Sequence, residues 1–234
     1  MNSMIPGAPA PAPLSPWRAL WSVVTDPIAT FGRLGPRPAI FPAYLLQMVA
    51  GLAGFVLSYP YLMQLIEQGA AAAPGTSPEQ VAFTKMTALT GGLVSAVAAP
   101  WVAGLLVSLV ALFMAQFQGG SLPFSAFFGM VGYARLPLVI ATLLGGLWVR
   151  LLGQPLDISP GALLSAEASP VLKAALGTLN PFGLWYYALL AIGFAALHQK
   201  PPAKGAAFAL LLFLLYLFFA MAGGGLSAVF TPQP

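Results

Sequence analysis

The chain has 234 residues, of which 59% are hydrophobic and 6% are charged, and its net charge at pH 7 is +4. A soluble domain carries about 25% charged residues, so nine basic and five acidic side chains cannot cover a water-facing surface of this size. The composition excludes a soluble globular protein and indicates an integral membrane protein.

Residues 1–16 are rich in Ala and Pro and are predicted to be a disordered tail, because they offer nothing to bury. Residues 17–37 are predicted to be an amphipathic interfacial segment, since apolar side chains recur there at helical spacing. Asp26 followed by Pro27 predicts the start of a second short helix. Tryptophans and arginines typical of the lipid headgroup region occur in this segment at Trp17, Arg18, Trp21, Arg33 and Arg37.

We predict an all-α integral membrane bundle of five transmembrane helices, which form one domain over residues 38–230. A hydrocarbon core of ~30 Å needs about 20 apolar residues per helix, and polar, turn-rich stretches such as residues 67–84 separate the apolar ones. The predicted spans cover about residues 38–66, 86–117, 123–152, 181–197 and 205–225.

The third span is predicted to be kinked or broken near residues 135–137, where Arg135 is a cation in an apolar stretch and Pro137 removes a backbone donor. In one geometry a single helix places Arg135 near the bilayer midplane, where a charge needs polar partners. Such partners could be carbonyls freed by Pro137, or the side chains of Gln47, Gln116 and Tyr133. In the geometry that we favour, residues 123–134 form a short interfacial or re-entrant helix and Arg135 lies at the cytoplasmic headgroup level.

An N-terminus in the cytoplasm agrees with the positive-inside rule, because five basic residues then lie inside and three outside. The heavy use of Ala, Gly, Pro and Leu suggests a GC-rich bacterial genome, so the protein is expected in a bacterial inner membrane. With five spans and the N-terminus inside, its C-terminus is expected in the periplasm. The inner set is Arg18, Arg33, Arg37, Lys200 and Lys204, and the outer set is Lys85, Arg150 and Lys173.

No catalytic residue, cofactor or metal site is predicted. The single histidine, His198, falls in a predicted turn, and all five carboxylates fall in predicted tails or loops. The chain has no cysteine, which excludes cysteine-ligated metals. Its basic residues form no run or stripe, so no nucleic-acid partner is expected.

The segment Gly132-Tyr133-Ala134-Arg135-Leu136-Pro137 matches a G-Y-x-x-x-P motif. Together with Gly35-Pro36 before the first span and Asn180-Pro181 at the start of the fourth, it resembles the Yip family of Rab/Ypt-interacting membrane proteins. The resemblance implies a five-span bundle with a cytoplasmic N-terminus, whose eukaryotic members bind prenylated Rab GTPases and form homo- or hetero-oligomers. Only Gly35-Pro36 remains here of the family's D-L-x-G-P box, which puts a GTPase partner in doubt.

Our hypothesis is a non-enzymatic scaffold or adaptor that organises anionic lipids or partner proteins at the cytoplasmic face, as a homo-oligomer or with another membrane protein. The alternative is a small transporter or channel, or an accessory subunit of one, with a cavity lined by the broken third helix. The candidate lipid or partner site consists of Gly132, Tyr133, Arg135 and Pro137. A cytoplasmic rim is predicted from Trp17, Arg18, Trp21, Arg33, Arg37, His198, Lys200 and Lys204.

Overall fold

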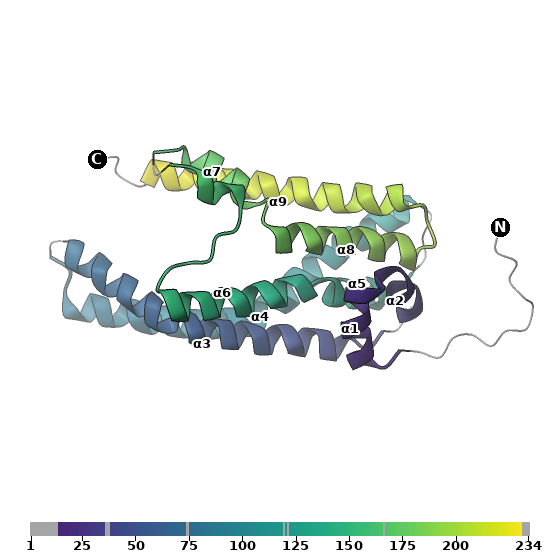
Figure 1. Ribbon diagram of the computed structural model, residues 1–234, viewed down its shortest axis with the longest axis horizontal. Coiled ribbons are helices and arrows are strands. Elements are labelled where there is room, and N and C mark those ends of the chain that lie inside the picture. Colours follow the sequence, from purple (N-terminus) through teal and green to yellow (C-terminus); the bar gives the residue numbers. More distant parts are fainter. Residues whose placement is uncertain are drawn as a thin grey trace, which may run out of the picture.

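The computed structural model describes residues 14–35, 38–73, 75–118, 120, 122–165 and 167–230. Every regular element within these ranges is helical, as predicted (Figure 1). In chain order the elements are α1 (Pro16–Thr25), α2 (Pro27–Leu34), α3 (Ile40–Ala72), α4 (Pro78–Phe117), α5 (Phe124–Ala134), α6 (Leu136–Leu152), the 3-10 turn η1 (Pro160–Leu163), α7 (Pro170–Gly177), α8 (Pro181–Leu197) and α9 (Pro202–Phe230). The predicted tail lies mostly outside the described residues, and Arg37 and Pro36 also lie outside them.

The membrane-spanning bundle is confirmed. Within the described residues, four segments are long and apolar enough to cross a bilayer: Ile40–Ala72, Pro78–Phe117, Phe124–Leu152 and Pro202–Gly224. The fourth predicted span, residues 181–197, corresponds to α8, which meets the same criterion when taken with α7, to which it is joined at a bend of 51°. The fold is therefore a helical membrane bundle of four spans, or five with the bent pair.

The first two spans extend further than the sequence predicts. Residues 67–84 are mostly helical, because α3 continues to Ala72 and α4 already begins at Pro78. A capping box starts α4: the Ser77 hydroxyl accepts from Gln80 N, and the Gln80 side chain accepts from Ser77 N. Satisfied backbone donors thus allow a helix in a stretch that its polarity identifies as a loop.

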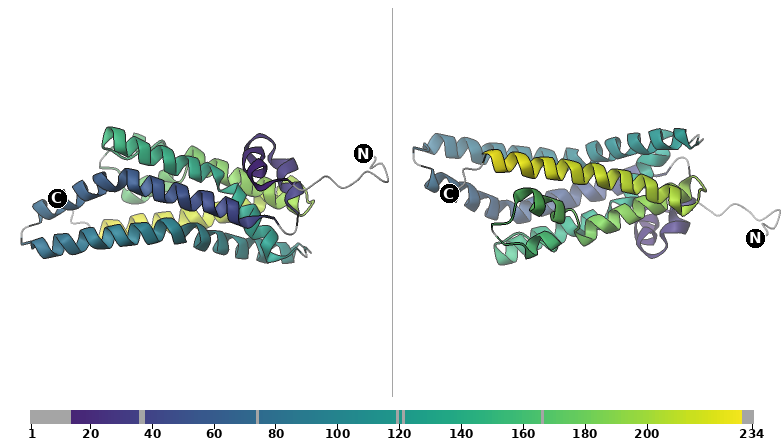
Figure 2. Two further views of the ribbon diagram at one scale, coloured as in Figure 1. Left: turned by 90° about the horizontal axis from the view of Figure 1, so that it is seen from below. Right: turned by 90° about the horizontal axis from the view of Figure 1, so that it is seen from above.

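The two N-terminal helices close one end of the bundle, where Figure 2 shows them against the other helices. The Asp26 side chain accepts from Ala29 N and caps α2, as the Asp-Pro pair predicts. Val23 and Phe31 are fully buried in the core, whereas Trp17 and Trp21 are 63% and 72% exposed. The segment is therefore amphipathic in the structure, with its tryptophans facing outward.

The α5 helix lies in the core, and the interfacial or re-entrant geometry that we favoured for residues 123–134 is wrong. Phe127, Met130 and Val131 are fully buried, and α5 and α6 together form one 29-residue span. Glycines allow this placement, since a Cβ on Gly132 would lie 2.7 Å from Tyr44 Cε2 of α3. Arg135 consequently lies inside the span, eleven residues after Phe124, or ~16 Å at about 1.5 Å per residue.

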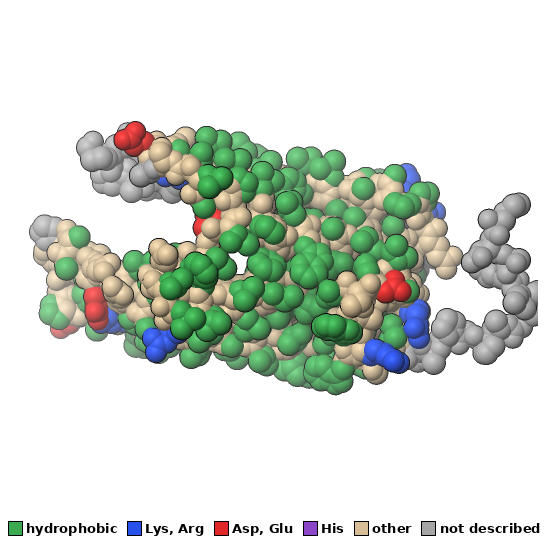
Figure 3. Space-filling model, in the orientation of Figure 1, with side chains coloured by type: hydrophobic (Ala, Val, Ile, Leu, Met, Phe, Trp, Pro, Cys, Tyr) green, Lys and Arg blue, Asp and Glu red, His purple; other side chains and the backbone are tan. Residues whose placement is uncertain are grey.

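Charged side chains gather at the two ends of the molecule, and a hydrophobic belt lies between them (Figure 3). Large apolar side chains are exposed along this belt, for example Leu106, Phe113 and Phe218 at 58%, 60% and 64%. Exposing such a surface to water is unfavourable, whereas contact with lipid chains carries no such cost. The distribution of exposed side chains thus supports the span assignment independently of helix length.

Candidate functional site

Arg135 occupies the junction between α5 and α6. Its backbone (φ −77°, ψ 2°) leaves the helical conformation, and its N–H donates to Val131 O at 3.2 Å while its carbonyl accepts from Leu138 N at 2.9 Å. Pro137 has no N–H, so the carbonyl of Tyr133 loses its regular helical donor. The sequence therefore breaks the hydrogen-bond ladder at the position that carries the cation.

Gln47 of α3 is the polar partner of this break. Its Oε1 accepts from Arg135 Nε at 2.6 Å, and its Nε2 donates to the carbonyls of Gly132 and Ala43, both at 3.1 Å. Gln47 is only 6% exposed, so one buried amide ties α3 to both the α5 backbone and the guanidinium. Of the three side chains predicted as possible partners of Arg135, Gln47 is thus the one that binds it.

The other two predicted partners, Tyr133 and Gln116, do not contact the guanidinium through a hydrogen bond. The Tyr133 hydroxyl donates to Ala39 O at 2.9 Å, just before α3 begins, and Gln116 is exposed near the end of α4. Among the described residues no carboxylate forms an ion pair with Arg135, whereas Lys85 and Glu67 form one at the far ends of α3 and α4. The guanidinium is therefore held by a neutral amide.

An aromatic side chain of α8 completes the surroundings of the cation. The ring centre of Tyr186 lies 6.0 Å from Arg135 Cζ, at the outer range of a cation–π contact. Tyr186 is 7% exposed, and its hydroxyl has no hydrogen-bond partner within the described residues. Tyr186 belongs to a run of aromatic residues near the start of α8 whose composition is typical of a belt at the membrane surface, yet it is buried here. The inward-facing series on α8 (Gly183, Tyr186, Leu190 and Gly193), spaced by three and four residues, is the signal that places it inside.

Two cavities meet at Arg135. One, of about 220 Å³, lies between α3, α4 and α6 and is also lined by Gln47, Ser95 and Thr142. The other, of about 550 Å³, lies between α4, α6, α8 and α9 and is also lined by Tyr186. Arg135 and Leu138 line both, so the broken span separates the two spaces.

Of the four candidate residues Gly132, Tyr133, Arg135 and Pro137, only Arg135 lines these cavities. The other three are buried in helix contacts. Gly132 admits the Tyr44 ring, and Tyr133 ties α5 to the start of α3. Their roles in the structure are therefore in packing and in shaping the break at which Arg135 lies.

The predicted rim residues within the described part of the chain lie at one end of the bundle, on α1, α2, the turn between α8 and α9, and the first turn of α9 (Figure 1). His198 differs from the others because it is half-buried. Its Nδ1 lies 2.9 Å from Phe194 O, and its ring packs against Phe127 and Phe194. The exposed members are Trp17, Arg18, Trp21, Arg33, Lys200 and Lys204.

The helix bundle, its apolar belt and the buried polar break together define a multi-pass α-helical membrane protein. The Yip1 domain family model matches residues 21–224, and the chain belongs to this family. It is 24% identical over 220 residues to the "Membrane protein YknW" of Bacillus subtilis (strain 168), covering 90% of this chain and 92% of that protein. No solved structure matches the chain.

Proposed function

We propose that this protein is a non-enzymatic scaffold or adaptor of the Yip type, which organises anionic lipids or partner proteins at the cytoplasmic face of a bacterial inner membrane. The observation that supports this role is the convergence of α1, α2 and the α8–α9 turn at one end of the bundle. Their exposed side chains combine tryptophan with arginine and lysine, which suits a surface that meets phospholipid headgroups. Neither the family nor its Bacillus relative's name indicates an enzymatic activity.

The charge distribution supports placing this end in the cytoplasm. Among the described residues, the end formed by α1, α2 and the α8–α9 turn carries four basic side chains and one acid, Asp26. The charged residues described towards the other end are three basic ones, Lys85, Arg150 and Lys173, and four acidic ones, Glu67, Glu79, Asp157 and Glu167. An excess of basic residues favours the cytoplasmic side, which leaves the C-terminal end of α9 on the periplasmic side. A second copy or another membrane protein would assemble against the exposed apolar belt.

Extraction of the protein with its surrounding bilayer into polymer nanodiscs tests the lipid role. We expect anionic phospholipid to be enriched over the bulk membrane, and Arg18→Gln combined with Lys204→Gln to reduce that enrichment severalfold, since each cation near such a surface contributes about 1 kcal/mol. The matched control pairs Arg150→Gln with Lys85→Gln at the opposite end and should leave enrichment unchanged. Equal losses in the two double variants, measured by lipid mass spectrometry, would contradict the proposal.

A small transporter or channel remains the second candidate, because Arg135 and Leu138 line cavities on both sides of the broken span. Such a break at membrane depth is tolerated where it lines a cavity. Chloride and proton flux into liposomes containing the purified protein separates the candidates. Flux above that of empty liposomes favours the channel, and its absence favours the scaffold.

A further inference from the structure

The larger of the two cavities at Arg135 has the size of a ligand site. Its volume of about 550 Å³ falls within the ~300–1,000 Å³ that small-molecule pockets occupy. Most of its lining consists of apolar side chains from α4 and α9. A molecule that fills it must therefore bury a largely hydrocarbon surface.

This cavity opens towards lipid. Leu106 of α4 and Leu215 and Phe219 of α9 line it and are 58%, 41% and 67% exposed, so they are not enclosed by the bundle. These residues belong to the apolar belt that the bilayer covers. A hydrocarbon chain can thus enter sideways between α4 and α9 without crossing water.

The inner wall of the same cavity is polar and positively charged. Arg135 donates one of its five N–H groups to Gln47. No carboxylate within the described residues pairs with Arg135. Tyr186 lines the cavity beside it, and its buried hydroxyl lacks a partner within the described residues. A buried cation and an unpartnered buried hydroxyl on one wall both require an acceptor, and a negatively charged one suits both.

The start of α8 adds to the positive electrostatic potential in the cavity. Asn180 and Gly183 line the cavity, and the Asn180 side chain caps the helix by accepting from Gly183 N at 2.7 Å. The N-terminus of a 17-residue helix carries a partial positive charge. No Asp or Glu is among the residues that line the cavity, so a cationic head group would find no counter-charge there.

We propose that this cavity binds a single-chain amphiphile with an oxyanion head group, a carboxylate or a phosphate monoester. The head accepts hydrogen bonds from Arg135 and, after a small turn of the Tyr186 ring that uncovers its buried oxygen, from the Tyr186 hydroxyl. The chain leaves between α4 and α9. A single chain fits better than a two-chain phospholipid, because Arg135 lies ~16 Å along the span at about 1.5 Å per residue, where a glycerol headgroup would be buried in hydrocarbon. The site uses none of the rim residues, so it stands or falls separately from the proposed scaffold role.

Binding to the full chain in nanodiscs of zwitterionic lipid tests this site. Each of the four probes carries a chain of about 16 carbons, whose length is comparable to half of a hydrocarbon core of ~30 Å. The probes are palmitate, hexadecyl phosphate, hexadecanol and hexadecyltrimethylammonium. We expect saturable binding of at least one of the two anions and none of the alcohol or the ammonium. The stronger of the two anions identifies the head group, and equal, non-saturable uptake of all four probes would overturn the proposal.

Two tyrosine variants separate binding from folding. Tyr186→Phe should weaken anion binding about tenfold, as expected for one hydrogen bond to a charged group, and should leave stability intact because its hydroxyl has no partner to lose. Tyr133→Phe is the matched control: it removes the bond to Ala39 O, so it should lower stability and leave anion affinity unchanged. Arg135→Gln should abolish saturable binding if it folds. Unchanged affinity in Tyr186→Phe would refute the site even if Arg135→Gln fails to fold.

Discussion

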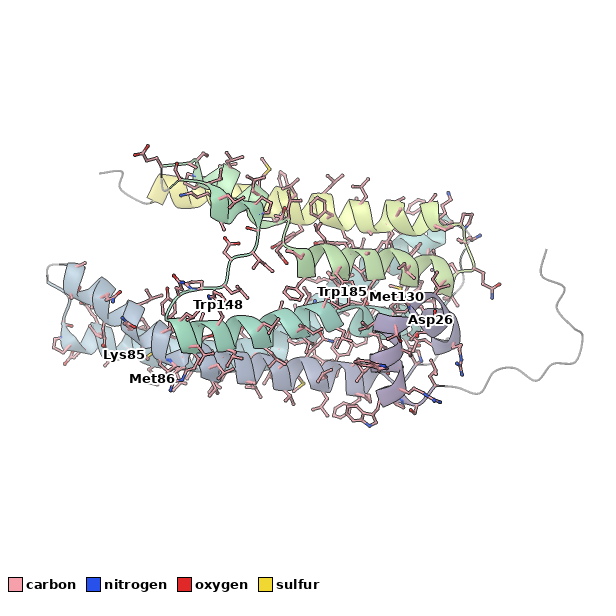
Figure 4. The ribbon with its side chains drawn as sticks, in the orientation of Figure 1. Asp26, Lys85, Met86, Met130, Trp148 and Trp185 are labelled. Carbon is pink, nitrogen blue, oxygen red and sulfur yellow. The ribbon has the colours of Figure 1, made fainter. Side chains whose placement is uncertain are left out.

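The two halves of this bundle differ in how closely their helices pack. In the half that holds α1, α2 and α5, aromatic side chains such as Phe127, Phe194 and Phe208 are fully buried and stacked or tilted against one another. Towards the other end, the α3–α4 hairpin and the α7–α9 arm diverge (Figure 3). Figure 4 labels a residue in each half, Met130 with no exposure and Trp148 with 39%.

Arg135 lies where the two kinds of packing meet. On one side it follows the buried α5 helix, and Gln47 fixes its guanidinium. On the other side it faces the two cavities. The two halves therefore have different roles: the packed half positions the guanidinium, and the open half leaves space around it. Substitutions in the packed half should therefore have larger effects on stability than substitutions in the open half.

Loss of the Gln47 amide should have the largest effect. Gln47→Leu removes the acceptor of Arg135 Nε and the donor to the Gly132 carbonyl, and leaves a cation in apolar surroundings. We expect the free energy of unfolding to fall by roughly 1.5–3 kcal/mol, the range for hydrogen bonds to charged groups. Titration with a denaturing detergent measures it. Gln116→Leu, at an exposed glutamine on α4, is the control and should stay within about 0.5 kcal/mol.

Crowding the contact between α8 and α9 should have the next largest effect. A Cβ at Gly205 of α9 would collide with the backbone carbonyl of Ala191 in α8, which a side-chain rotation cannot relieve. Gly205→Ala should therefore lower stability by about 1–3 kcal/mol, as overpacking does. In the same helix but in the open half, Gly223 has nothing within 4 Å, so Gly223→Ala should be neutral or stabilising. Similar losses in the two variants would remove the contrast between the halves.

Much of the fold could be predicted from the chain because hydropathy reports directly on the solvent. The apolar stretches predict the spans, and the Asp26-Pro27 pair predicts where α2 begins. Helix ends were harder, since the capping box of Ser77 and Gln80 extends α4 into a polar stretch. Local hydrogen bonds decided that boundary, and composition does not report them.

The candidate site could be predicted only in part. Arg135 stands out because it is a cation in an apolar span, and Gln47 was among its possible partners. The depth of α5 could not be derived, because it depends on Tyr44 and Pro38 of another segment approaching Gly132 and Gly129. Long-range contacts of this kind leave no periodic signal in a helix that is apolar on every side.

The exposed ion pair between Lys85 and Glu67 should have the smallest effect. It joins the far ends of α3 and α4 in the open half, and the two side chains are 34% and 61% exposed. Water and salt screen such pairs, so Lys85→Met should cost at most roughly 0.2–1 kcal/mol, and less at high salt. A double-mutant cycle with Glu67→Gln isolates the pair from other effects of losing Lys85. If the coupling equalled the loss in Gln47→Leu, a solvent-exposed contact of the open half would stabilise the fold as much as a buried one of the packed half, and the contrast between the halves would be lost.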